Sequence, residues 1–338
     1  MTRHCRKSWI RFLALAGCLS LLAGAPDPGV DLAPPAAAAE TRGAGSPAAA
    51  AAPAPTLADV AYGPHPRQVL DFWKAEAARP TPLVFYIHGG GWMPFPKDKT
   101  VVVTHGLADY LAAGVSVVSI NYRLVSDAQA AGVKPPVEWP MHDAARALQF
   151  VRAKAAEWGL DKARIGLFGG SAGACTSLWL ALHDEMAEPG SADPVAREST
   201  RPSCVAVAGA QTSLDPEQMR RWIPNSVYGG HAFGFEGPWT ADVFQRFYEG
   251  RDRVLPWIRE YSPIEWASAG DPPVFLQYDA PPAAAGQVEK DPTHSAVFGT
   301  KLQQRLREVG VECHLSYPGS PETKYRSRYE FLVDQLSK

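Results

Sequence analysis

The sequence predicts an α/β fold in which helices flank a mainly parallel β-sheet. From about residue 57 onward, short apolar runs alternate with longer segments whose apolar residues recur every three or four positions. One of these runs, residues 83–87, stops at three consecutive glycines. Strands that alternate with helices form a mainly parallel sheet covered by helices on both faces.

The first half of the folded part contains three expected strands and two expected helices. Apolar runs at 83–87, 115–122 and 164–170 predict the strands. Apolar residues at 144, 148, 151, 155 and 158 lie on one face of a helix, which Gly159 ends. A second helix is expected at 172–182, directly after the third strand.

The second half continues the alternation after one long interruption. Strands are expected at 204–211, 272–279 and 311–317, and helices at 298–310 and 327–336. The aromatic-rich segment 211–266 lies between two of these strands. It could form a cap over a cleft or pack irregular helices onto the core, since aromatic side chains suit both.

Residues 1–25 have the pattern of a secretory signal peptide. Four basic residues precede an apolar run from Phe12 to Ala25 that contains no acid. A membrane span needs about 20 apolar residues, so we expect cleavage and an exported protein without a membrane anchor of this kind. The segment "LAGC" resembles a bacterial lipobox, so a lipoprotein anchored at Cys18 is the alternative. Residues 26–57 are mostly Ala, Pro and Gly, which predicts a disordered linker before a domain at 58–338.

Charge and cysteine content exclude several classes of function. Without the first 25 residues, 29 basic residues stand against 35 acidic ones, a net charge of −6. An acidic domain without a basic cluster is a poor candidate for binding nucleic acid. Cys175, Cys204 and Cys313 are widely spaced in apolar contexts and are expected to be buried free thiols. No metal-ligand spacing occurs, so we expect neither a metal nor a cofactor, and the oligomeric state stays open.

Ser171 is the candidate nucleophile. It lies in "GGSAG", residues 169–173, between an expected strand and an expected helix. A serine on such a sharp strand-to-helix turn is exposed for attack. The turn requires small flanking residues, because larger side chains would collide with the backbone packed on either side. The alternative is a tight turn that carries a surface serine.

A glycine-rich loop 83 residues upstream of Ser171 supplies the second signal. The segment "HGGGW", residues 88–92, follows an expected strand. Consecutive glycines let the backbone come close to a ligand and direct N–H groups toward it. With the N–H that follows the nucleophile, they would stabilise the oxyanion of acyl transfer, where one such donor contributes about 100- to 1000-fold in rate.

Together these motifs resemble the α/β-hydrolase fold, in particular HGGG-type esterases of the hormone-sensitive-lipase-like and feruloyl-esterase-like groups. The segments "LDFW", "YIHGGGW", "INYRL", "HDAARALQFVR", "RIGLFGGSAGA" and "YSPIEW…PPVFLQY" occur in the family's order across about 57–338. The resemblance implies an eight-stranded sheet, Ser171 as nucleophile and an oxyanion hole formed by Gly90, Gly91 and Ala172. It also implies that His88 supports the loop and that Asp71 and Asp143 are structural polar residues.

The acid and the base depart from the family pattern. The family's acid follows the strand "PPVFLQYD" by a few residues, where this chain has proline and alanine. Asp291 in "DPTHS" is the favoured acid, and Asp279 at the strand end is its competitor.

The family's histidine follows the last strand, but no histidine follows His314, which lies too early, on the strand itself. His294, three residues after Asp291, and His231, in the aromatic segment, are the remaining candidates.

Two functions remain open at this point. The intact motifs predict hydrolysis of a small-molecule or polysaccharide-linked carboxylic ester by Ser171 with a non-standard base. The missing histidine predicts instead a catalytically degenerate binding protein, because loss of this base costs roughly a millionfold in turnover in one well-studied protease.

Overall fold

The computed structural model describes residues 53–94, 106–321 and 324–338. The described residues belong to one compact unit. Residues 1–52, which include the predicted signal peptide, Cys18 and most of the predicted linker, lie outside the described residues. None of the helices in the described ranges has the length and apolar character needed to cross a membrane.

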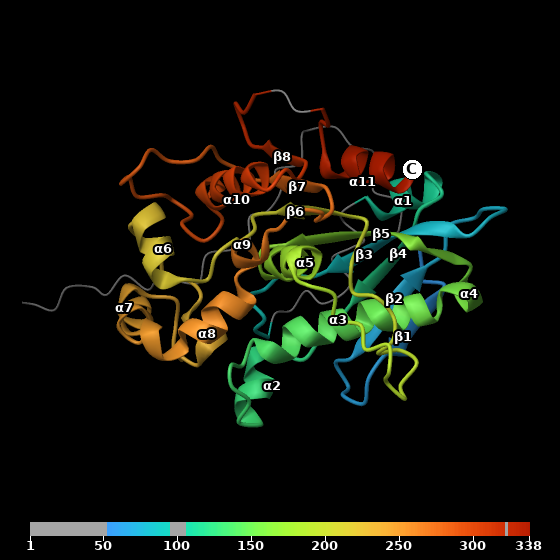
Figure 1. Cartoon of the computed structure of the whole chain (residues 1–338), viewed down its shortest axis with the longest axis horizontal. Coiled ribbons are helices and arrows are strands. Elements are labelled where there is room, and N and C mark those ends of the chain that lie inside the picture. Colours follow the sequence, from blue (N-terminus) through green and yellow to red (C-terminus); the bar gives the residue numbers. More distant parts are fainter. Residues whose placement is uncertain (1–52, 95–105, 322–323) are drawn as a thin grey trace, which may run out of the picture. The chain divides into compact units, whose positions relative to one another are not determined.

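Eight strands of the described residues form one sheet, as predicted (Figure 1). Its spatial order is β1-β2-β4-β3-β5-β6-β7-β8. Strand β2 pairs antiparallel with β1 and β4, and every other pair is parallel. The strands are β1 (Leu57–Ala61), β2 (Val69–Trp73), β3 (Thr81–Ile87), β4 (Ser116–Ile120), β5 (Leu160–Gly170), β6 (Cys204–Ala208), β7 (Val274–Gln277) and β8 (Cys313–Ser316).

From β3 onward, helices connect successive strands, and helices cover both faces of the sheet. They are α1 (Leu107–Ala112), α2 (Val125–Ala130), α3 (Glu138–Ala153), α4 (Ala155–Trp158), α5 (Ala172–Leu182), α6 (Pro216–Trp222), the 3₁₀ helix η2 (Gly230–Phe233), α7 (Ala241–Glu249), α8 (Arg251–Tyr261), α9 (Pro263–Trp266), α10 (Ala296–Glu308) and α11 (Arg328–Leu336).

Strand β3 shows how the two faces are buried. Successive side chains of a strand point to opposite faces. Leu83, Phe85 and Ile87 join the larger apolar core with α3 and α5, whereas Val84 and Tyr86 join a second core with α1 and α11. Figure 1 shows α1 and α11 on one side of the sheet and α3 and α5 on the other. A central parallel strand buried on both faces reads as an uninterrupted apolar run, which is why the sequence predicts it well.

The six strands and four helices expected from the sequence are all present, and most of their boundaries differ by a few residues; β6, for example, ends at Ala208 and not at residue 211. The helix expected up to residue 158 is divided at Lys154 into α3 and α4. Gly159 ends α4 with φ +69°, a left-handed conformation that glycine adopts without steric cost. The last residues of the predicted linker contact the domain: Pro53 accepts a hydrogen bond from Trp73 Nε1 at 2.9 Å, and Leu57 begins β1.

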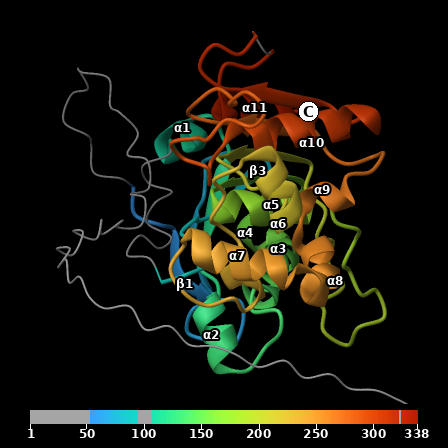
Figure 2. The same cartoon turned by 90° about the vertical axis from the view of Figure 1, so that its left-hand side faces the viewer.

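The aromatic-rich segment 211–266 folds into α6, η2, α7, α8 and α9. Figures 1 and 2 show α6, α7 and α8 gathered together beside the sheet. All three expected free thiols are present: Cys175 and Cys204 are buried, and Cys313 is half-buried.

The parallel strands bring four loops to one edge of the sheet. The register pairs Ile87 with Gly169, Gly170 with Ala208, and Ala208 with Gln277, so β3, β5, β6 and β7 end level with one another. Ligands of open α/β sheets bind outside the carboxyl ends of the strands. The glycine loop, Ser171 and the long loop after β7 therefore meet at this edge.

Candidate active site

Ser171 occupies a strained turn between β5 and α5. Its φ is +52° and its ψ −121°, an arrangement that a residue with a Cβ adopts rarely and at a cost. The backbone N–H of Ser171 donates to Ala208 O at 2.9 Å, which ties the turn to β6. The fold therefore holds the serine in a conformation that the chain would otherwise avoid.

Two of the flanking glycines are required by collision, as the sequence analysis expects. A Cβ at Gly173 would lie 2.1 Å from Ile87 O, and one at Gly169 would lie 2.5 Å from Gly173 O. The expectation is wrong for Gly170, where a Cβ would meet no atom within 4 Å. Its small size is not imposed by packing.

His294 links Ser171 to Asp291 through a continuous chain of hydrogen bonds. Its Nε2 lies 2.9 Å from Ser171 Oγ, and its Nδ1 lies 2.7 Å from Asp291 Oδ2. The second oxygen of Asp291, Oδ1, accepts the backbone N–H groups of Thr293 and His294, each at 3.2 Å. A carboxylate at Nδ1 keeps the proton there and leaves Nε2 free to accept a proton from the serine.

The environment keeps Asp291 ionised. Burial alone would raise the pKa of this carboxyl, but the hydrogen bond and charge of His294 and the two backbone N–H groups lower it below the ordinary value. The side chains of Asp291 and His294 are 44% and 29% exposed. Ser171 is also partly exposed, so a substrate can reach the hydroxyl.

The other candidate residues lie elsewhere. Asp279 is exposed just beyond the end of β7. His231 is buried and its Nε2 bonds Gly91 O at 2.9 Å, so this side chain is engaged with the glycine loop. His314 lies on β8, where its Nε2 contacts Glu312 Oε1 at 2.8 Å. The structure therefore brings Ser171 together with the pair that lies three residues apart, Asp291 and His294.

The glycine loop turns back beside Ser171. Gly91 and Trp92 have φ values of +64° and +55°, and Met93 N donates to Gly90 O at 3.1 Å, which is the pattern of a type I′ turn. A Cβ added to Gly89 would lie 3.3 Å from Ser171 Cβ, so the loop packs directly on the serine. The N–H of Ala172 belongs to the first residue of α5, and helix geometry leaves it without an intrahelical acceptor.

The aromatic-rich segment holds the same loop from the other side. His231 Nε2 bonds Gly91 O, and a Cβ at Gly91 would lie 2.6 Å from Trp239 Cζ2. Burial lowers the pKa of His231 to about 4, so the imidazole is neutral near pH 7 and donates through Nε2. Residues of the 211–266 segment thus contribute directly to the shape of the glycine loop.

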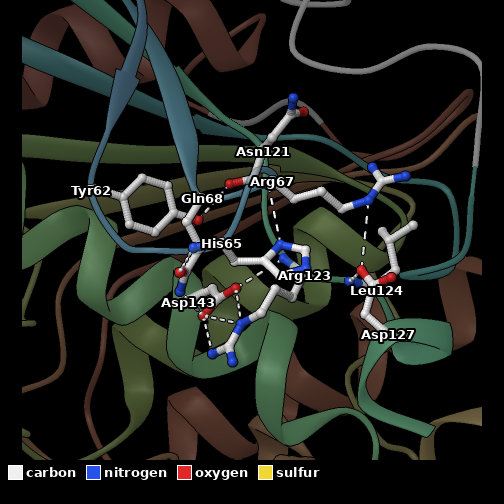
Figure 3. A network of polar contacts seen from close by, with 9 residues as sticks. All are labelled: Tyr62, His65, Arg67, Gln68, Asn121, Arg123, Leu124, Asp127 and Asp143. Carbon is white, nitrogen blue, oxygen red and sulfur yellow. Dashed lines mark hydrogen bonds and ion pairs between the residues drawn. The ribbon is translucent and has the colours of Figure 1, made fainter. Parts of the chain in front are cut away.

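A polar network joins Asp143 to the segment that follows β4 (Figure 3). Asp143 accepts hydrogen bonds from Gln68 Nε2 and from the backbone and guanidinium of Arg123. This fixes the segment after β4, where Tyr122 OH donates to His88 O at 2.7 Å. The rings of His88 and Tyr122 stack with centroids 4.3 Å apart.

These contacts agree with the roles that the resemblance implies: His88 supports the glycine loop, and Asp143 is a structural polar residue. Asp71 is likewise buried and accepts Asp59 N at 2.8 Å.

Sequence reasoning missed four residues around the site: Gly209, Gln211, His231 as a loop support, and Trp239. Gln211 could have been identified from the sequence, because it is a polar residue at the end of the apolar segment "CVAVAGAQ". Among the described residues, no group of three or more His, Cys, Asp or Glu side chains could hold a metal ion.

Comparison with known proteins gives the chain relatives among esterases. Esterase LipQ of Mycobacterium tuberculosis is 32% identical over 280 residues, covering 79% of this chain and 56% of that protein. The probable carboxylic ester hydrolase LipM of the same organism is 35% identical over 141 residues, which are 39% of this chain and 30% of that protein. The chain thus spans well under two thirds of the length of these relatives.

A solved structure and a family model agree with this relationship. A truncated carbohydrate esterase from gut microbiota superposes with a TM-score of 0.61 at 18% identity, covering 83% of this chain and 96% of that one. This likeness confirms the predicted fold. The BD-FAE family model matches residues 70–280, which is more than half of the chain and includes the glycine loop, the serine turn and β7. The chain therefore belongs to the BD-FAE family.

Proposed function

We propose that this protein is a serine esterase that hydrolyses carboxylic esters. The hydrogen-bonded chain from Asp291 through His294 to Ser171 Oγ carries the proposal, because it supplies the base that the last-strand loop lacks. The family membership and the names of the relatives support the same reaction class.

The proposed reaction has two stages, and the residues keep the same roles in both. Ser171 Oγ forms a bond to the ester carbonyl carbon while its proton passes to His294 Nε2. The tetrahedral intermediate then breaks its bond to the alkoxy oxygen, which leaves as an alcohol with that proton. Water then attacks the acyl carbon while its proton passes to His294 Nε2. The second tetrahedral intermediate breaks its bond to Ser171 Oγ, which takes that proton back from His294 as the acid leaves. Asp291 stabilises the imidazolium that forms each time.

The N–H groups of Gly90, Gly91 and Ala172 are the proposed oxyanion hole. The close approach of Gly89 to Ser171, where an added Cβ would lie 3.3 Å from Ser171 Cβ, supports this assignment, because it brings the glycine loop against the proposed nucleophile. Positioned donors of this kind stabilise charge that develops only in the transition state, so they raise the rate without tightening substrate binding.

For the substrate, we propose a small-molecule or polysaccharide-linked ester. The similarity to a carbohydrate esterase supports the polysaccharide-linked class. Release of acetate from acetylated xylan, compared with release from p-nitrophenyl acetate, separates the two classes.

The deciding experiment compares the wild type with Ser171→Ala and His294→Gln on p-nitrophenyl acetate. Loss of turnover in both variants, at unchanged thermal stability, is expected. The alternative is a degenerate binding protein that holds an ester without cleaving it. Equal rates for the wild type and Ser171→Ala, no faster than buffer, would favour that alternative.

We also propose export from the cell, on the pattern of residues 1–25. Amino-terminal sequencing of the mature protein tests it. A start near residue 26 is expected, whereas a lipid-modified start at Cys18 would support the lipoprotein alternative.

A further inference from the structure

The proposed base, His294, lies on the loop after β7 and not on the loop after the last strand, where the family has its histidine. Other contacts must therefore hold it in place. His294 lies only two residues before α10, and its side chain is partly exposed. Such a loop must be fixed from outside, because misplacement of a reacting group by about 1 Å can cost 100-fold in rate. The end of β6 supplies the contacts.

Gln211 bonds the backbone directly beside the base. Its Nε2 lies 2.7 Å from Thr293 O and 3.1 Å from Gly209 O. Because both partners are carbonyl oxygens, only the NH₂ group of the amide can satisfy them. Gln211 is 0% exposed, so no water competes for these bonds from outside.

The two ends of one peptide group are thereby fixed. The carbonyl of Thr293 and the N–H of His294 belong to the same planar peptide. Gln211 bonds the carbonyl, and Asp291 Oδ1 accepts the N–H at 3.2 Å. This peptide sets the direction in which His294 leaves the backbone.

Gly209 forms the surface on which the imidazole lies. A Cβ at this residue would lie 3.1 Å from His294 Cδ2 and 3.4 Å from His294 Cβ, so only glycine lets the ring sit this close. Its φ of +56° also favours glycine. The segment is itself anchored to β7, because Gly209 N donates to Gln277 O at 2.9 Å and Tyr278 OH donates to Ala210 O at 2.9 Å.

We infer that Gln211 is a positioning residue, which together with Gly209 aligns His294 with Ser171. The inference rests on the proposed function of this triad. The remaining amide oxygen, Gln211 Oε1, is buried without a hydrogen-bond partner among the described residues. A buried unpaired acceptor destabilises the fold, so packing alone favours an apolar residue of this size. The hydrogen bonds that the NH₂ group donates to Thr293 O and Gly209 O explain why an amide occupies this position.

The test is Gln211→Met, which keeps the length of the side chain and removes its donors. The matched control is Thr212→Val, because Thr212 is also buried and donates from its side chain to a backbone carbonyl, Phe298 O at 2.9 Å, on α10. For Gln211→Met we expect kcat to fall about 10- to 100-fold, with KM within about threefold. The thermal midpoint should fall only modestly, because the carbonyls of Thr293 and Gly209 lose a donor while the unpaired Oε1 is removed. Thr212→Val should keep the wild-type kcat.

An NMR measurement distinguishes a role of Gln211 in positioning His294 from a role in stabilising the fold. The proton on His294 Nδ1 gives a far-downfield NMR signal when it is held between the imidazole and Asp291. This signal should weaken in Gln211→Met and persist in Thr212→Val. An unchanged kcat in Gln211→Met would overturn the inference, and so would an equal loss of kcat in both variants. If Ser171→Ala keeps full turnover, the proposed function itself fails, which is a different result.

Discussion

Replacement of Asp291 by asparagine tests the hydrogen bond between Asp291 Oδ2 and His294 Nδ1, because it replaces the acceptor with an NH₂ donor. Asp291 Oδ1 accepts two backbone N–H groups, and Oδ2 faces His294 Nδ1 at 2.7 Å. In Asp291→Asn, the amide oxygen must stay with the two N–H donors, because an NH₂ group cannot accept them. The NH₂ group then faces Nδ1.

This orientation forces the wrong tautomer on the base. An NH₂ donor at Nδ1 requires Nδ1 to be unprotonated, so the proton moves to Nε2 and faces Ser171 Oγ. The serine then has no acceptor for its proton. The equivalent change in one well-studied protease lowers kcat about 10⁴-fold while the geometry stays intact. At about 1.36 kcal/mol for each factor of ten, this corresponds to a loss of about 5.4 kcal/mol of transition-state stabilisation.

The assay is the pH dependence of kcat for p-nitrophenyl acetate, with Asp279→Asn as the matched control. Asp279 is the other aspartate of the β7 loop and is exposed at the strand end. We expect a drop of about 10⁴-fold for Asp291→Asn near pH 7 and less than twofold for Asp279→Asn. A drop below about tenfold for Asp291→Asn, or an equal drop for Asp279→Asn, would refute the tautomer argument.

Two further predictions concern the glycine loop. In Gly91→Ala, the new Cβ would lie 2.6 Å from Trp239 Cζ2 at a φ of +64°, so the loop must shift; kcat should fall about 100-fold, as for loss of one oxyanion donor. A Gly91→Ala variant with the kcat and KM of the wild type would contradict this prediction. His231 has its pKa lowered by burial to about 4, whereas the unfolded chain takes up the proton near pH 6.5. The unfolded state therefore binds more protons between these values, and His231 alone should lower the stability of the wild type by about 3 kcal/mol as pH falls from 6.5 to 4. Between these pH values, the free energy of unfolding of His231→Gln, measured with urea, should depend less steeply on pH than that of the wild type. An equally steep dependence would exclude His231 as the cause.

The serine turn of the proposed nucleophile and the glycine loop could be predicted because their sequence signals are local. A strand, a tight turn with small residues and a helix are read from neighbouring positions, and the structure places Ser171 as those positions require. The central strands were predictable for the same reason, since each is a continuous apolar run. Strands β1 and β2, which pair antiparallel with each other, gave no such signal, and only the resemblance to an eight-stranded fold implied them.

The proposed base could not be chosen from the sequence because its position depends on long-range contacts. His294 reaches a serine 123 residues earlier only because the β7 loop folds onto Gly209 and Gln211. The spacing of Asp291 and His294 showed that the two could meet each other, but not that they would meet Ser171. His231 was an equal candidate on sequence, and only its burial against Gly91 O shows its different place.

The most direct test of the account is the rate at which a fluorophosphonate probe labels Ser171, with the adduct located by mass spectrometry. Labelling requires a serine activated by a base. We predict one adduct, on Ser171, with labelling slowed at least 1000-fold in His294→Gln and little changed in His314→Gln. Rapid labelling of Ser171 in His294→Gln would show that another group activates the serine and would contradict the account.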